Sequence, residues 1–110
     1  MANEIAELTK AVVEFRDARD WRRFHNSKDL ALAISIEAAE LNELFLWKKS
    51  DEAEKQKIAE ELGDVFIFGL LLAHENGFDV KRLVMDKLSI NSTKYPVEKS
   101  KGSSRKYNEL

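Results

Sequence analysis

The sequence contains no cysteine, one proline and four glycines, and these scarcities restrict both its chemistry and its fold. Without cysteine, the chain has no disulfide scaffold, thiolate zinc site, iron–sulfur cluster or cysteine nucleophile. Few helix-breaking residues, together with apolar residues that recur at steps of three and four, are typical of helices. The sequence therefore predicts an all-α protein.

A strong net charge and a long apolar run are also missing. Eighteen Lys and Arg against 20 Asp and Glu leave a formal net charge of −2, so charge predicts no nucleic-acid partner. The longest apolar stretch, Val65–Ala73, is far shorter than the roughly 20 residues of a membrane-spanning helix. The first ten residues carry acids where a signal peptide would carry basic residues. We therefore expect no membrane partner and a cytoplasmic location.

The 110 residues, of which 44% are hydrophobic, are enough for a single domain spanning residues 1–110. Caps and periodicity predict four helices, over residues 3–19, 27–47, 50–75 and 79–92. A basic tail, residues 93–110, follows them with five Lys or Arg against two Glu. Pro96 and the segment Gly102–Ser104 predict that this tail is mostly irregular. The expected fold is a four-helix bundle with a basic C-terminal tail.

The apolar stretch Val65–Ala73 is apolar on every face of the helix that it would form. Such a helix has to be covered on all sides, and four short helices of one chain do not easily do that. We therefore expect oligomerisation to complete the bundle, as a homo-oligomer that is a dimer or a tetramer. Gly63 and Gly69 would permit close approach of helices there.

Two carboxylates stand where the helical periodicity calls for apolar residues. The series 30, 34, 37, 41, 44 is apolar except for Glu37, and the series 58, 61, 65, 68, 72 is apolar except for Glu61. Each acid is followed three residues later by another, Glu40 and Asp64, so each pair shares a helix face. The sequence thus places four acids next to the predicted core.

A buried carboxylate without a partner costs several kcal/mol or takes up a proton, so these acids require positive charge nearby. The neighbouring stretches 29–47 and 65–76 contain no Lys or Arg, which favours a metal ion. Oxygen ligands suit Mg²⁺ or Mn²⁺ better than zinc. A di-iron site would need Glu-x-x-His, and this spacing is missing before both His25 and His74. The alternative is that the acids are ordinary solvated residues, because such pairs also arise by chance.

Two motifs carry a resemblance to a known family. The segments EAAELNELFLW (37–47) and EELGDV (60–65) resemble the signature of the MazG-like all-α nucleoside triphosphate pyrophosphohydrolases. The segment FRDARDWRRFH (15–25), with INSTKYP and SSRKYNEL near the C-terminus, resembles the dCTP pyrophosphatase branch in particular. The resemblance covers nearly the whole chain.

The resemblance implies hydrolysis of a nucleoside triphosphate substrate, typically a deoxynucleotide, to the monophosphate and pyrophosphate. Such an enzyme would remove surplus or noncanonical nucleotides. It would bind Mg²⁺ through four carboxylates: Glu37, Glu40, Glu61 and Asp64. Which of them acts as a general base stays unassigned. Two alternatives stay open, a non-catalytic helical interaction module with an acidic face and a nucleotide sensor without turnover.

The resemblance also implies four residues that contact the nucleotide: His25, Trp47, Lys87 and Asn91. Each of them also has an ordinary alternative role. His25 could pack within its loop, and Trp47 could cover the edge of the core. Lys87 could be a solvated helix lysine, and Asn91 could cap a helix end. Phe68 stands where dCTP-preferring relatives carry a tyrosine, which predicts a dNTP range broader than dCTP. In the tail, Lys101 and Arg105 could screen a triphosphate or belong to a solvated chain end.

Overall fold

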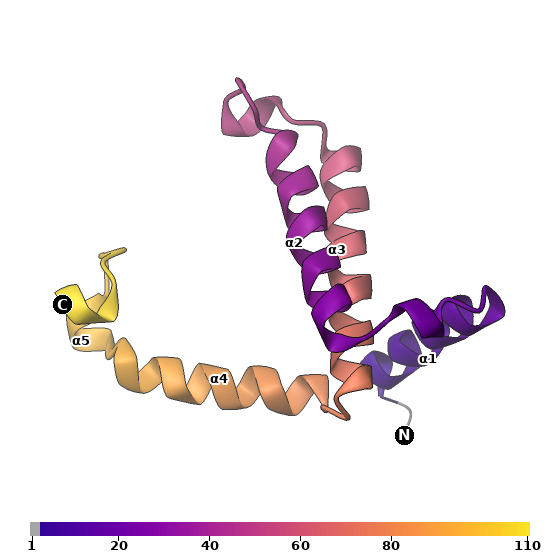
Figure 1. Cartoon of the computed structure of the whole chain (residues 1–110). Helices are drawn as coiled ribbons and strands as arrows, with labels where there is room; N and C mark the ends of the chain where they lie inside the picture. The colour runs from indigo at the N-terminus through magenta and orange to yellow at the C-terminus, as the bar shows by residue number, and fades with distance from the viewer. Residues whose placement is uncertain (1–2) are drawn as a thin grey trace. The chain divides into compact units, whose positions relative to one another are not determined.

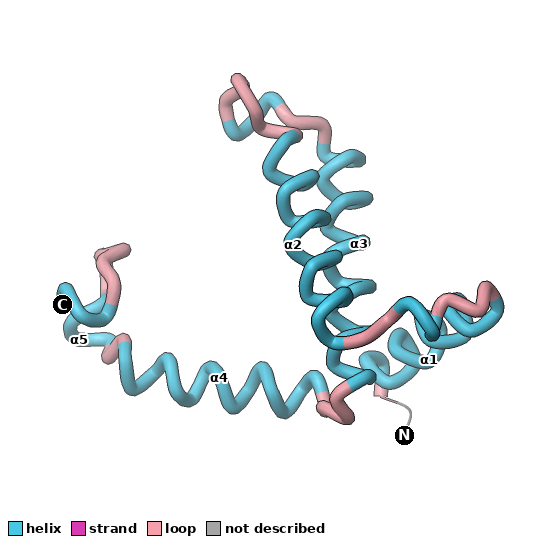
Figure 2. The backbone as a smooth tube through the Cα atoms, viewed as in Figure 1, coloured by secondary structure: helices cyan, strands magenta, loops and turns pink. Residues whose placement is uncertain are grey.

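The structure is a computed structural model that describes residues 3–110, and these consist of helices, turns and loops (Figure 1). The helices are α1 (Glu4–Ala18), α2 (Ser27–Glu43), α3 (Lys55–Glu75), α4 (Val80–Lys94) and α5 (Val97–Ser100). Three short 3₁₀ turns lie at Arg22–Phe24, Ser50–Glu52 and Tyr107–Glu109. No strand occurs within residues 3–110, as Figure 2 shows, so the predicted all-α class is confirmed. None of the helices there has the length and apolar character needed to cross a membrane.

The described residues form two compact units, residues 3–78 and Asp79–Leu110. In the first unit, α2 and α3 lie side by side in opposite directions, and α1 packs against α3 (Figure 1). Four apolar side chains of this unit are buried: Leu30, Ala53, Leu71 and Ala73. The core of the unit therefore lies between α2, α3 and the loop that joins them.

Short polar side chains determine where the helices begin. Asn3 accepts a hydrogen bond from the Ile5 N–H at 2.9 Å and caps α1. Asn26 accepts one from the Asp29 N–H at 2.8 Å, and Asp79 accepts one from the Arg82 N–H at 2.9 Å. These bonds satisfy donors that the first turn of a helix leaves free. The predicted caps of α2 and α4 are therefore confirmed.

The loop between α2 and α3 corrects two predicted boundaries. Helix α2 ends at Glu43 rather than Trp47, because the chain turns over the next residues and Trp47 adopts a left-handed φ of 62°. Helix α3 begins at Lys55, five residues later than predicted, since the turn at Ser50–Glu52 does not propagate. Ala53 is buried with an extended backbone, and this anchoring separates the turn from α3.

The second unit consists of α4, α5 and the residues that follow. Helix α4 continues to Lys94, and Pro96, with a φ of −61°, precedes the four-residue helix α5. Beyond α5 the chain returns, so that the rings of Tyr95 and Tyr107 pack edge to face at 6.1 Å. Lys94 Nζ lies 4.9 Å from the centre of the Tyr107 ring. The tail is thus more ordered than the predicted, mostly irregular chain.

Candidate active site

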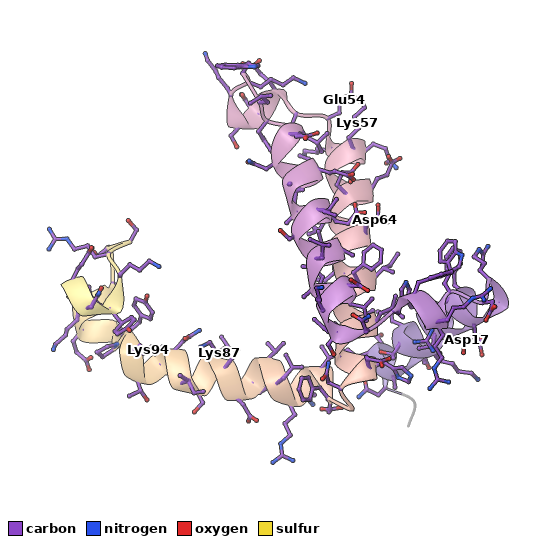
Figure 3. The ribbon with its side chains drawn as sticks, viewed as in Figure 1. Asp17, Glu54, Lys57, Asp64, Lys87 and Lys94 are labelled. Atoms are coloured by element: carbon purple, nitrogen blue, oxygen red, sulfur yellow. The ribbon has the colours of Figure 1, made fainter. Side chains whose placement is uncertain are left out.

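Helices α2 and α3 bring three of the four predicted acids together. Glu37 on α2 and both Glu61 and Asp64 on α3 each place a carboxylate oxygen within 4.8 Å of the other two. All three residues are half-buried. Glu61 and Asp64 are three residues apart and therefore share one face of α3, and the closeness of their oxygens to that of Glu37 places this face next to α2 (Asp64 is labelled in Figure 3). We call these three residues the acid triplet.

The acid triplet is electrostatically unfavourable without a cation. Burial, a hydrogen bond with Glu40 and the charges of the neighbouring acids together raise the pKa of Glu37 to about 7, and burial is the largest of these causes. Burial and then the charge of Glu40 also raise the pKa of Glu61. Both pKa shifts favour neutral acids, since ionised forms here would be poorly solvated and would repel one another.

The oxygen atoms of the acid triplet remain available to a ligand. Oε2 of Glu37 and Oε2 of Glu61 are buried, and neither has a hydrogen-bond partner among the described residues. The ion pairs found within residues 3–110 involve other acids. Buried polar atoms in proteins are almost always partnered. A hard divalent cation with oxygen ligands fits this arrangement.

Glu40 lies one turn beyond Glu37 on α2 and is exposed. It stands outside the acid triplet, although it is close enough to raise the pKa of both Glu37 and Glu61. The structure therefore brings three of the four predicted ligands into one cluster and leaves Glu40 at its solvent side. Its role as a ligand stays a prediction.

A cavity of about 300 Å³ adjoins the acid triplet. Its lining comes from α1, the connector that follows it, α2 and α3: Val12, Phe15, Arg16, Trp21, His25, Glu37, Asp64, Ile67, Phe68 and Leu71. The rings of His25 and Phe68 meet edge to face, with their centres 6.4 Å apart. Two predicted binding residues, His25 and Phe68, thus share one cavity with two of the predicted metal ligands. We call it the aromatic pocket.

The sequence analysis did not predict two residues of the aromatic pocket, Trp21 and Arg16. Trp21, which packs edge to face on Phe15 at 5.8 Å, belongs to a segment that was singled out only for its resemblance. Arg16 is 3% exposed and is the buried charged residue of α1. It lies four residues after Val12, on the apolar face of that helix. The same rule that identified Glu37, a charge within an apolar stripe, would have identified Arg16.

The model of the MazG-like family matches residues 32–110 of the chain. The chain belongs to the MazG-like family. Human and rat dCTP pyrophosphatase 1 are each 37% identical to it, and each alignment covers 96% of this chain and 67% of the relative. A pyrophosphatase structure from Archaeoglobus fulgidus matches with a TM-score of 0.81 and 38% identity. That match covers 87% of this chain and 95% of the other. The resemblance to MazG-like proteins is thereby confirmed, together with the fold class.

In this MazG-like chain, the acid triplet and one wall of the aromatic pocket lie within the residues that the family model matches. The other wall, with Arg16, Trp21 and His25, precedes residue 32. The cavity therefore joins a part that the family model describes to a part that lies outside it.

Several predicted binding residues lie away from the aromatic pocket. Trp47 is 94% exposed in the turn after α2 and does not line the pocket. Lys87 and Asn91, one turn apart on α4, line a shallow groove of the second unit (Lys87 is labelled in Figure 3). Lys101 and Arg105 are exposed near the C-terminus. Contact of these residues with a nucleotide stays a prediction.

Proposed function

We propose that this MazG-like protein is a magnesium-dependent pyrophosphohydrolase that cleaves (deoxy)nucleoside triphosphates to the monophosphate and pyrophosphate. The observation that carries the proposal is the acid triplet, which adjoins an apolar, aromatic pocket of about 300 Å³. Family membership supports it, as do relatives named dCTP pyrophosphatase and pyrophosphatase. Its role would be to remove surplus or noncanonical nucleotides from the pool.

The cation would be held by the acid triplet, with Glu40 as a further ligand. The orphaned oxygens of Glu37 and Glu61 and the absence of any sulfur or imidazole from the triplet favour Mg²⁺, with Mn²⁺ as a substitute. When bound, the cation would shield the negative charge of the triphosphate against an attacking water. One carboxylate of the group would accept the proton of that water.

The aromatic pocket would hold the nucleobase, with the triphosphate towards the acids. Phe15, Trp21 and Phe68 offer ring faces or edges, and aromatic side chains stack on every base with little regard to sequence. Phe68 has no hydroxyl with which to hydrogen-bond a particular base. This supports a dNTP range that includes dCTP and extends beyond it.

A panel of dNTPs incubated with Mg²⁺, with pyrophosphate and orthophosphate measured separately, tests the proposal. We expect pyrophosphate and the monophosphate as products. The Glu61→Gln variant keeps the side-chain shape but loses a charge worth several kcal/mol, so its rate should fall about 100-fold or more. Glu43→Gln, an exposed neighbour at the end of α2, is the matched control and should keep its rate.

Other outcomes of the same experiment point to other functions. Orthophosphate alone would contradict the proposed cleavage position, and an undiminished rate in Glu61→Gln would contradict the metal assignment. Binding without turnover would favour a nucleotide sensor. Neither binding nor turnover would favour an interaction module with an acidic face.

The same proposal includes a homo-oligomer, a dimer or a tetramer, built from single-domain chains. The family match extends over residues of both compact units, which supports one MazG-like domain. Large apolar side chains stay exposed on a single chain, including Phe66 at 63% and Leu88 at 53%. Exposed apolar surface of this kind marks interaction sites. Sedimentation analysis should show a dimer or tetramer, and a monomer at tens of micromolar would contradict this assignment.

A further inference from the structure

A buried arginine in the aromatic pocket has no role in the function proposed so far. Arg16 lines the pocket, is 3% exposed, and its Nη1 is buried without a hydrogen-bond partner among the described residues. A buried charged donor that stays unpaired costs more than a neutral one, so such a group points to an absent acceptor.

The other two nitrogens of the guanidinium each have a partner. Nε donates to Asp17 Oδ1 at 2.9 Å, and Nη2 lies 2.9 Å from the same oxygen. Asp17 is half exposed, so the partner of Arg16 lies towards solvent (Asp17 is labelled in Figure 3). One edge of the planar guanidinium is therefore held in place by Asp17. The two N–H groups of Nη1 on the opposite side are left for a ligand.

The surroundings of Arg16 indicate which part of a nucleotide would meet it. Arg16 and its pocket neighbours on α1 form the apolar wall, while the acid triplet comes from α2 and α3. No ion pair joins Arg16 to Glu37 or Asp64 within the described residues. The acids would attract the cation and the triphosphate, which leaves the base next to Arg16. This step rests on the proposed function.

We propose that Arg16 determines base specificity, with Nη1 donating a hydrogen bond to a carbonyl oxygen of the nucleobase. Arginine has only donors, so it pairs with an acceptor and repels a facing amino group. Cytosine, thymine and guanine each carry a carbonyl oxygen, whose two lone pairs can accept from both N–H groups of Nη1. Each ring nitrogen of adenine has a single lone pair, and the amino group beside N1 and N7 would face the second N–H and leave it unpaired. A site built around a buried donor rejects a ligand that leaves the donor unpaired. The pocket therefore favours the three carbonyl-bearing bases over adenine.

Binding of cleavage-resistant dNTP analogues, with a methylene bridge between the α and β phosphates, tests this specificity by calorimetry in Mg²⁺. Wild-type protein should bind the dCTP, dTTP and dGTP analogues at least 10-fold more tightly than the dATP analogue. Arg16→Met keeps the side-chain length but removes the donor. The affinity of this variant for the three carbonyl-bearing analogues should fall about 10-fold or more, and its affinity for the dATP analogue should change less than about twofold. Arg16→Lys retains a charged donor and should recover part of the preference.

The matched control is Arg23→Met. Arg23 pairs with Asp20 at 3.0 Å and is largely exposed, so this variant removes an equivalent ion pair outside the pocket. The affinities of Arg23→Met for the four dNTP analogues should equal those of the wild type. Circular dichroism and thermal unfolding would establish that each variant is folded.

Three results would overturn the role of Arg16. An equal loss for all four analogues in Arg16→Met would mean that the residue contacts the phosphates or supports the fold. A wild-type protein without preference for carbonyl-bearing bases would exclude the proposal even if Arg16→Met did not fold. Wild-type protein that binds none of the analogues would remove the nucleotide substrate itself, and this outcome distinguishes failure of the proposed function from failure of the Arg16 contact alone.

Discussion

Replacing Glu37 by glutamine should stabilise the metal-free protein and remove much of its response to magnesium. Burial and the neighbouring acids raise the pKa of Glu37 from 4.5 to about 7. The folded protein therefore holds this proton more tightly than the unfolded chain does. The stability that the neutral form contributes is complete below about pH 4.5 and is lost as the pH rises through about 7.

The size of the effect follows from the same pKa values. A rise from 4.5 to about 7 corresponds to a loss of about 3 kcal/mol once the carboxyl is ionised. Glutamine has nearly the same shape as protonated glutamate and does not titrate. The free energy of unfolding of Glu37→Gln should therefore exceed that of the wild type by up to about 3 kcal/mol at pH 8, and the two should nearly coincide at pH 4.5.

Urea unfolding followed by circular dichroism, at several pH values between 4.5 and 8, measures this difference. With EDTA present, Glu37→Gln should be the more stable protein at pH 8. With Mg²⁺, the wild type should gain stability by mass action and the variant should gain less. Glu43→Gln, exposed at the end of α2, is the control and should stay within about 0.5 kcal/mol of the wild type.

Two results would refute this reasoning. A difference between Glu37→Gln and the wild type that does not change with pH would mean that Glu37 is not a destabilised carboxylate. An equal gain from Mg²⁺ in both proteins would mean that Glu37 does not hold the cation.

Two further predictions concern the fold. Leu30, 1% exposed, is the largest fully buried side chain among the described residues. Leu30→Ala should therefore lower the free energy of unfolding, measured in urea, by about 2–5 kcal/mol. A loss below about 1 kcal/mol would contradict the place of Leu30 in the core. Gly77 ends α3 with a φ of 68°, and no described atom lies within 4 Å of an added Cβ. Gly77→Ala should therefore lower the free energy of unfolding by about 1–2 kcal/mol through backbone strain alone. Gly77→Asn should lower it less, because asparagine tolerates the left-handed conformation. Equal losses in the two variants would contradict the backbone explanation.

Helix ends were predictable wherever local chemistry determines them. Asn26 and Asp79 cap helices through bonds to a backbone N–H three residues away, and Gly77 adopts the left-handed conformation that ends α3. The loop before α3 was not predictable, since Ser50 and Asp51 have the composition of a cap but lie in an isolated turn. Burial of Ala53 decides that boundary, and burial depends on residues distant in sequence.

The acids of the site were predictable because a charge within an apolar stripe is conspicuous. Glu37 and Glu61 both occupy such positions, and the structure brings them together with Asp64. The aromatic pocket was not predictable, because its walls come from α1, α2 and α3 and require the relative placement of three helices. Periodicity indicates which face of a helix is buried but not which residues of another helix it meets.

The buried charges of both signs lie in one cavity without pairing to each other. Arg16 of α1 pairs with Asp17 at its solvent side, and Oε2 of Glu37 on α2 has no hydrogen-bond partner among the described residues. Apolar residues at both positions would stabilise the helices more, since an uncompensated buried charge is destabilising. A molecule with a carbonyl-bearing ring at one end and a cation-bound polyanion at the other would give both Arg16 and the acids a partner.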